Sequence, residues 1–328
     1  MKRILVIQTA SIGDVILATA VIEKLHSHYP EAKIDYLIKK GNEGLFKEHP
    51  FLNKILIWDK KVNKTKNLFK LLLSIRKTKY DLVVNIQRFF SSGILTALSG
   101  AKTTVGFKKN PLSIFFTRCY PHGLGTKGSN YLHEVQRNQT LITQITNTEY
   151  SKPRLYPSTT DYDSIQEYTH CQYVCVAPAS LWYTKQYPME QWHKMLNATI
   201  STNSAIYLIG GPADTELCNQ IIAHLPHHHT INFAGKLSLL QSAALMKSAT
   251  MNYVCDSSPM HLCSSVDAPV SAIFCSTIPE FGFGPLSTNS RIIQTSKDLP
   301  CRPCGLHGHK QCPNGTFECA YSIKFPKE

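Results

Sequence analysis

The sequence predicts an α/β protein built from two Rossmann-like, doubly wound domains. Three observations carry this prediction: the strands read as short apolar runs without polar alternation, helical patterns separate them, and the whole series occurs twice. A chain of 328 residues also exceeds what one hydrophobic core usually serves. We therefore expect two parallel sheets, each covered by helices on both faces.

Apolar runs place the strands in order along the chain. In the first half they predict five strands, at residues 3–8, 33–38, 54–58, 81–87 and 104–106. In the second half they predict six strands, at residues 173–177, 205–210, 230–233, 251–255, 270–274 and 291–295. Apolar residues at helical spacing predict the helices between them, at residues 15–28, 66–79, 189–202, 213–224, 239–247 and 259–266.

A stretch without periodicity separates the two series. Residues 146–163 are rich in threonine, serine, proline and tyrosine, which is typical of a linker. We place the boundary so that residues 1–155 form the first domain and residues 156–328 the second, which carries a cysteine-rich tail at 301–319. Ligands of such folds bind beyond the carboxyl ends of the strands, so we expect the domains to face a shared cleft there.

Composition and charge narrow the class of protein. The hydrophobic fraction of 43% and the charged fraction of 17% are those of a globular protein. The net charge of +13 attracts anionic partners, with a solvated basic surface as the alternative. No apolar run approaches the roughly 20 residues that span a bilayer, and the first run is too short for a signal peptide. We therefore expect a cytoplasmic protein, with peripheral contact with the inner face of the cytoplasmic membrane as a further candidate.

The first strand leads into Ser11-Ile-Gly-Asp14, and a helix follows at once. Gly13 permits a tight turn, and Asp14 falls in the first helical turn at the carboxyl edge of the sheet. Either Asp14 serves chemistry there, or it only offsets the helix dipole. Neither a G-x-G-x-x-G motif after this strand nor a P-loop motif occurs, which argues against a dehydrogenase or a P-loop enzyme.

Two strand ends in the second half carry small or polar residues. Ser180 and Lys185 follow the first of these strands, where a hydroxyl and a mobile positive charge suit an anion, with a merely solvated lysine as the alternative. The glycine pair that ends at Gly211 lets a ligand approach the backbone. An acid just beyond, Asp214 or Glu216, would then accept hydrogen bonds from a ribose, unless Asp214 only caps a helix.

A third strand end reads Asp256-Ser-Ser-Pro-Met-His261. Pro259 suits an early helical position, because proline has no amide hydrogen to lose there. The exposed amides of that helix start, with the hydroxyls of Ser257 and Ser258, would hold a phosphate. His261 lies in the same turn, and a structural histidine is the alternative there.

Four of the eleven cysteines cluster near the end of the chain in the pattern C-x2-C-x7-C-x6-C. Cys301, Cys304, Cys312 and Cys319 have the number and approximate spacing of a structural zinc site. A disulfide or redox pair and free thiols are the alternatives. We expect any metal here to be structural and unattached to the chemistry.

Together these motifs resemble glycosyltransferase family 9, the ADP-heptose:lipopolysaccharide heptosyltransferases. The resemblance spans nearly the whole chain and rests on Ser11-Ile-Gly-Asp14, Lys185 with Tyr-Pro and Trp192, Gly210-Gly-Pro-Ala-Asp214 and Asp256-Ser-Ser-Pro-Met-His261. It implies a GT-B fold and an inverting, metal-independent transfer of a sugar, heptose from ADP-heptose, to a lipopolysaccharide core or similar glycan. The implied partners are a nucleotide-diphosphate sugar and an anionic glycolipid, with no cofactor for catalysis and no nucleic acid.

The resemblance also implies roles for the matched residues. Asp14 corresponds to the catalytic base, and Lys185 to the lysine at the donor phosphate. The implied donor contacts in the second domain are Ser180, Gly211, Asp214, Glu216, Asp256, Ser257, Ser258 and His261, although the family commonly has glycine where Ser258 stands. The implied acceptor contacts in the first domain are Ser11, Gly13, His133 and Arg137. The last two would share one face of a helix, and a helix that only packs the two domains together is the alternative.

Two other functions fit part of the sequence. A nucleotide-sugar epimerase or hydrolase of the same fold would need no acceptor. A basic nucleic-acid-binding protein with a four-cysteine zinc module fits the charge but leaves the motifs at the strand ends unexplained. Six lysines of the first domain are candidates for a surface that meets an anionic membrane, and these are Lys39, Lys40, Lys60, Lys61, Lys64 and Lys66.

Overall fold

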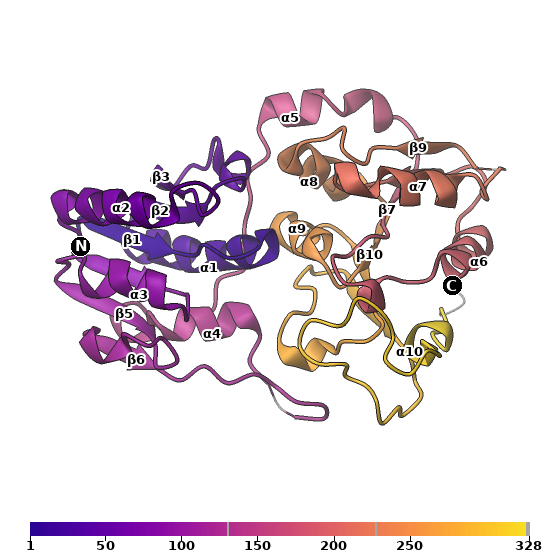
Figure 1. Ribbon diagram of the computed structural model, residues 1–328. Helices are drawn as coiled ribbons and strands as arrows, with labels where there is room; N and C mark the ends of the chain where they lie inside the picture. Colours follow the sequence, from indigo (N-terminus) through magenta and orange to yellow (C-terminus); the bar gives the residue numbers. More distant parts are fainter. Residues whose placement is uncertain (130, 227, 326–328) are drawn as a thin grey trace. The chain divides into compact units, whose positions relative to one another are not determined.

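The structure is a computed structural model that describes residues 1–129, 131–226 and 228–325. The chain forms two compact units, which Figure 1 colours from indigo to magenta and from pink to yellow. The first unit consists of Met1–Leu124 and Leu132–Tyr156, and the second of Gly125–Tyr131 and Pro157–Glu328. The main division therefore falls one residue beyond the expected boundary. The short segment Gly125–Tyr131 belongs with the second unit, which no sequence pattern indicated.

The first unit contains a six-stranded parallel sheet in the order β3-β2-β1-β4-β5-β6. Its strands are β1 (Arg3–Ile7), β2 (Lys33–Lys39), β3 (Leu52–Trp58), β4 (Leu82–Asn85), β5 (Thr103–Phe107) and β6 (Arg118–Tyr120). Its α-helices are α1 (Ile12–His28), α2 (Lys64–Thr78), α3 (Phe90–Ala97) and α4 (Glu134–Thr140). Helix α1 packs against α4, and α2 packs against α3.

The second unit repeats this plan with the order β12-β11-β10-β7-β8-β9, again all parallel. Its strands are β7 (Tyr173–Ala177), β8 (Ala205–Leu208), β9 (Thr230–Asn232), β10 (Met251–Cys255), β11 (Val270–Phe274) and β12 (Ser290–Gln294). Its α-helices are α5 (Thr159–Asp163), α6 (Met189–Thr199), α7 (Thr215–Ile222), α8 (Leu239–Ser248), α9 (Ser258–Val266) and α10 (Glu318–Tyr321). Across the described parts of both units, no helix combines the length and the apolar character needed to cross a bilayer.

Burial explains why the central strands read as unbroken apolar runs. The four residues from Ile4 to Ile7 are all 0% exposed, because helices cover both faces of β1. Every residue of β7, β10 and β11 is likewise buried. Amphipathic helices supply the cover, and Trp192 of α6 is fully buried in the core of the second unit.

The predicted fold class is confirmed, since both sheets are parallel and every predicted strand and helix has a counterpart in the structure. Strand β6 and helices α3, α5 and α10 were not predicted. Strand β6 has three residues at the edge of the sheet and no apolar run. Helix α3 buries Ser92, Gly93 and Thr96 beside Leu95, so its sequence shows no apolar face. Helices α5 and α10 have five and four residues, which is too short for a clear helical period.

In both sheets the order in which successive strands are added reverses at the centre. In the first unit β1 lies between β2 and β4, and in the second β7 lies between β8 and β10. The connections on either side of such a pair leave in opposite directions, which opens a crevice beyond the carboxyl ends of the two strands. The candidate site residues follow these strands.

Candidate active site

Buried amide side chains occupy the switch point of the first unit. Gln8 follows β1 and Gln87 follows β4, and their side-chain amides are hydrogen-bonded to each other. Thr9 Oγ1 donates to Gln87 Oε1 over 3.0 Å. These buried bonds cross-link the ends of two neighbouring strands and so hold the loop that enters α1.

Asp14 is half-buried in the first turn of α1. Its Oδ2 accepts hydrogen bonds from Ser11 Oγ at 2.5 Å and from the Ser11 amide at 3.3 Å. Burial raises the pKa of Asp14, although the hydrogen bonds from Ser11 favour the charged form. The raised pKa therefore reflects burial more than stabilisation by the helix dipole, which would lower it.

A buried ion pair lies near Asp14. The guanidinium of Arg137 donates through Nε and Nη2 to Glu134 Oε2, at 2.9 and 2.8 Å. His122 Nε2 lies 3.4 Å from the same oxygen. Burial pushes the pKa of Glu134 upward, but the hydrogen bond from His122 and the charge of Arg137 outweigh it and lower the pKa. The negative charge of Glu134 in turn raises the pKa of Asp14, while Arg88, which follows β4, lowers it.

The predicted acceptor residues have structural partners in this unit. His133 precedes α4 as its N-cap, with Nδ1 accepting from the Val135 amide at 3.1 Å, so it does not share a helix face with Arg137. Arg137 is 3% exposed and bound to Glu134. Gly13 is a buried helical residue of α1, so the expectation that it forms a tight turn is wrong.

Lys60 lies at this edge of the sheet and was expected on an outer surface. It follows β3, and its Nζ donates to the carbonyl of Thr9 over 2.7 Å. The same Nζ lies 4.6 Å from the ring centre of Trp58. Burial and the charges of Lys39 and Lys64 lower the pKa of Lys60 to about 8. This half-buried lysine is therefore a cation beside the loop that leads to Asp14.

At the switch point of the second unit, Lys185 and Asp256 form an ion pair. Lys185 ends the 3-10 helix η5 (Tyr183–Lys185), and its Nζ lies 2.7 Å from Asp256 Oδ2. Their side chains are 16% and 9% exposed. Thr277, which follows β11, donates its hydroxyl to the same oxygen at 2.6 Å. The expectation that Lys185 is a mobile charge is therefore wrong, because this network holds its ammonium group in place.

The amino end of α9 lies beside this pair. Ser257 is the N-cap residue, and its Oγ donates to the carbonyl of Ala179 at 3.1 Å, which ties the loop after β10 to the loop after β7. Ser180 and Ser258 are both half-buried in these loops. His261 is buried in α9. The nine-residue helix thus starts next to Lys185 with Pro259 in its first turn, an arrangement suited to a phosphate.

The glycine turn after β8 is stabilised by its own acid. Asp214 closes the 3-10 helix η6 (Pro212–Asp214), and its Oδ2 accepts from the Gly211 amide at 2.7 Å. A Cβ on Gly210 would lie 2.9 Å from that oxygen, so glycine is needed there. Asp214 therefore caps the turn, the structural alternative left open by the sequence. Glu216 is exposed and accepts a hydrogen bond from Gln220.

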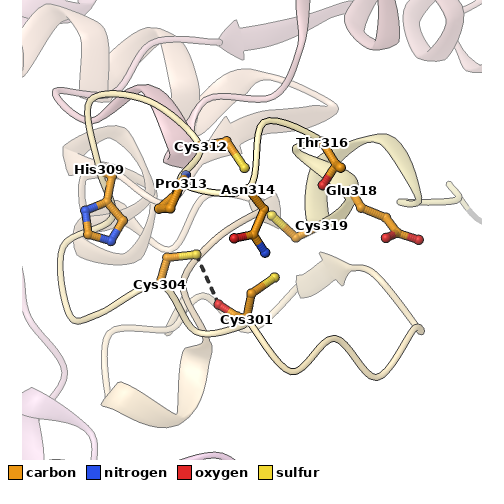
Figure 2. A pocket seen from close by; sticks show the side chains of 9 residues that line it. All are labelled: Cys301, Cys304, His309, Cys312, Pro313, Asn314, Thr316, Glu318 and Cys319. Atoms are coloured by element: carbon orange, nitrogen blue, oxygen red, sulfur yellow. Dashed lines mark hydrogen bonds between the residues drawn. The ribbon is translucent and has the colours of Figure 1, made fainter.

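The cysteine cluster lines a cavity of about 180 Å³ in the second unit (Figure 2). Within the described residues, all eleven cysteines are free thiols. In that part of the chain, no group of three or more metal-ligating side chains is arranged to hold an ion as it stands. The segment is bonded to the short helix that ends at Lys185, since His309 and Thr184 are hydrogen-bonded, a contact that no sequence pattern indicated. The structural zinc site stays a prediction.

Sequence reasoning missed several residues that the structure places beside the predicted ones. These are Gln8, Lys60, Gln87, Arg88, His122, Glu134 and Thr277. Gln8 and Gln87 end predicted strands, and Lys60, Arg88 and Thr277 lie within three residues after one. A polar residue at such a position is itself a usable signal in a parallel sheet. His122 has no such signal, because it reaches Glu134 only through the fold.

Comparison with known proteins identifies the family of the chain. The profile of glycosyltransferase family 9 (heptosyltransferase) matches residues 68–316. Lipopolysaccharide heptosyltransferase 3 of Escherichia coli is 26% identical over 278 residues, which cover 81% of each chain. Lipopolysaccharide heptosyltransferase 1 of Pseudomonas aeruginosa is 25% identical over 92% of this chain and 86% of its own.

Solved structures agree on the fold. A family 9 glycosyltransferase from Veillonella parvula has a TM-score of 0.78 and 23% identity, covering 89% of this chain and 85% of its own. The ADP-heptose lipopolysaccharide heptosyltransferase II of E. coli has a TM-score of 0.76 and 20% identity, covering 93% and 96%. The two doubly wound sheets are thus the two Rossmann-like domains of a GT-B fold. With the profile spanning most of its length, the chain belongs to glycosyltransferase family 9, and it is a glycosyltransferase.

Proposed function

We propose that this enzyme transfers heptose from ADP-heptose to a lipopolysaccharide core, with inversion at the anomeric carbon and without a catalytic metal. The names of the relatives support the sugar and the acceptor class. The observation that carries the mechanism is Asp14, a carboxyl with a raised pKa at the carboxyl end of β1. The first unit binds the acceptor in this proposal, and the second binds the donor.

On the acceptor side, Asp14 is the general base. A sugar hydroxyl is a weak nucleophile at neutral pH, so its proton must leave as the new glycosidic bond forms. A raised pKa makes Asp14 a stronger base than an ordinary aspartate, while Ser11 orients the carboxylate through its hydroxyl and amide. Attack from the face opposite the leaving group inverts the anomeric configuration.

His122 and Arg137 contribute to this side by stabilising the charge of Glu134, whereas His133 caps α4. Arg137 keeps Glu134 ionised, and Glu134 raises the pKa of Asp14. Lys60 and Arg88 supply positive charge at the same edge of the sheet, where an anionic acceptor would be attracted.

On the donor side, Lys185 and the start of α9 stabilise the leaving diphosphate. The diphosphate gains negative charge as its bond to the sugar breaks, so fixed positive groups favour the transition state over the bound donor. Asp256 and Thr277 hold the Lys185 ammonium in one position before the donor arrives. Ser180, Ser257 and Ser258 lie in loops beside it, and Gly211 and Glu216 remain candidates for contact with the nucleoside. These groups take the place that a metal ion has in other transferases.

A basic, partly apolar helix face supports contact with a membrane. Phe69 and Leu73 of α2 are 59% and 67% exposed, one helical turn apart, with the exposed lysines Lys66 and Lys70 beside them. Apolar side chains among lysines suit the headgroup region of an anionic bilayer. We place the enzyme in the cytoplasm, peripheral on the inner face of the cytoplasmic membrane. The double variant Phe69→Ser/Leu73→Ser should co-sediment less than the wild type with phosphatidylglycerol vesicles. With neutral vesicles the two proteins should co-sediment equally.

The donor and the acceptor are tested together in a transfer assay. Purified enzyme is screened by thermal shift against ADP-heptose, UDP-glucose and GDP-mannose, and the stabilising donor is then supplied in radiolabelled form with heptose-deficient lipopolysaccharide cores. We expect stabilisation by ADP-heptose above the other two and label transfer to the core without added metal and in the presence of EDTA. Stereochemistry is read from the anomeric coupling in the product. Turnover of donor without acceptor would instead favour the epimerase or hydrolase alternative.

A further inference from the structure

The segment that carries three of the clustered cysteines has no regular structure of its own. Residues 295–317, between β12 and α10, contain no helix or strand. Gly305, Gly308 and Gly315 within it have positive φ angles. Long irregular segments inside compact domains are uncommon, and small irregular folds usually need a covalent or metal cross-link to hold one conformation.

The four cysteines converge on one place in this segment. Cys301, Cys304 and Cys312 come from the loop and Cys319 from α10, and all four line the same cavity. Figure 2 shows their thiol groups turned toward the middle of the cavity, around the side chain of Asn314. Two pairs separated by a loop, converging on one space, form the ligand pattern of a tetrathiolate ion.

The backbone of this loop is bonded to the short helix that carries Lys185. His309 N donates to Thr184 Oγ1 at 2.8 Å, and Thr184 N donates to the His309 carbonyl at 3.1 Å. Cys304 N donates to the carbonyl of Ser276 at 2.9 Å, and Ser276 N to the carbonyl of Thr184 at 3.2 Å. The loop and η5 therefore hold each other in register.

Gly308 brings the loop directly against the stem of Lys185. A Cβ at Gly308 would lie 2.8 Å from Thr184 Oγ1 and 3.2 Å from Lys185 Cγ. The buried Arg302 anchors the other end of the loop, donating to the carbonyls of Cys275 and Thr277 at 2.7 and 2.8 Å. The conformation of the loop thus determines the surroundings of Lys185.

We propose that Cys301, Cys304, Cys312 and Cys319 bind one thiophilic transition-metal ion, zinc or iron, and that the loop so cross-linked holds Lys185 in position. Four thiolates around one ion suit zinc or iron, and each cysteine gives its thiol proton to solvent as its metal–sulfur bond forms. Asn314 lines the cavity, so this proposal requires its side chain to leave the space that the ion takes. The metal site stands independently of the proposed function, and only the consequence for the donor phosphate rests on it.

The metal site is tested by elemental analysis of the purified, untagged, full-length chain. We expect zinc and iron together to sum to about one ion per chain, and Cys301→Ser/Cys304→Ser to carry none. Cys171→Ser is the matched control, since Cys171 is an exposed thiol outside the cluster. Exchange of the ion for Co²⁺ should give the intense visible absorption of tetrahedral thiolate ligation. A metal-free wild-type chain that also binds no added zinc, or a disulfide within the cluster, would overturn the site.

The link to Lys185 is tested by deuterium exchange on the metal-loaded protein and on the same protein stripped with a chelator. We expect peptides that contain the Thr184 and His309 amides to exchange roughly tenfold faster without metal, because their mutual hydrogen bonds open. Peptides from β1 and α1 serve as the internal control and should not change. Metal bound at the cluster with unchanged exchange at Thr184 would overturn the link.

The variant Gly308→Ala changes the conformation of the loop without changing any of the four cysteines. It should keep its metal, since no thiol is altered, yet disturb Thr184 and Lys185 and weaken ADP binding in calorimetry. If the wild-type chain does not bind ADP at all, the proposed donor is wrong, while the metal content and the exchange data still decide the present inference.

Discussion

The two units share one sheet topology but place different chemistry at their switch points. In the first, the buried neutral amides of Gln8 and Gln87 link the ends of β1 and β4, and Asp14 accepts hydrogen bonds from Ser11 and has a raised pKa. In the second, a lysine and an aspartate are paired at 2.7 Å beside the start of α9. The equivalent position thus carries a half-buried carboxyl in one unit and an ion-paired lysine in the other.

This difference shows that strand order determines where a site lies but not what it does. Asp14 follows β1, the first strand of its unit in chain order, and Asp256 follows β10, the fourth strand of the other unit. One is near Glu134, a like charge, and the other is in contact with Lys185, an opposite charge. Substitutions at Asp14 and at Lys185 should therefore affect different steps of the reaction.

The largest effect is expected from Asp14→Asn. Loss of the base should lower kcat by roughly 10² to 10⁴-fold, while donor binding in calorimetry is unchanged. The measurement is single-turnover transfer from radiolabelled donor. Undiminished turnover would remove Asp14 from the mechanism and with it the contrast between the units.

The control for Asp14→Asn is a measurement of its melting temperature against pH, which tests whether the variant is folded. The folded state favours neutral Asp14, so the carboxyl contributes stability below its unfolded pKa of about 3.9, and that contribution is lost as pH rises through the raised folded pKa. Asparagine stays neutral throughout. Asp14→Asn should therefore melt at a higher temperature than the wild type near neutral pH, and the gain should disappear in acid.

A double-mutant cycle at Lys185 and Asp256 is expected to have the next largest effect. Lys185→Met leaves a buried carboxylate without its cation and should cost about 3 kcal/mol of stability, together with roughly tenfold or more in donor affinity. Adding Asp256→Asn should restore most of the stability but none of the affinity. Recovery of donor affinity in the double variant would make Lys185 structural only.

The smallest effect is expected from Ser11→Ala. The Ser11 hydroxyl favours the charged form of Asp14, so its removal raises the pKa of Asp14 further. The acid limb of the kcat/KM profile should then move to higher pH, with little change in the alkaline plateau. A uniform loss at every pH would indicate that Ser11 positions the acceptor instead.

Much of the fold was accessible from the sequence, because local patterns carry it. Unbroken apolar runs predicted the buried strands β1, β7 and β10, and small or polar residues after them predicted where the site lies. The β6 strand escaped prediction, since three residues at a sheet edge have no local pattern. The residues of the candidate site could be predicted from the sequence, but the hydrogen bonds and ion pairs between them could not.

The sequence by itself determined the two parallel sheets and the residues at their carboxyl ends, because burial on both faces and the position after a strand are local properties. Only the tertiary structure decided which of those residues meet. It paired Lys185 with Asp256, separated by 71 positions in the chain, and bonded the cysteine-rich loop to Thr184. Such partners depend on how distant segments pack, and the charges they bring determine whether a carboxyl acts as a base or as a counter-ion.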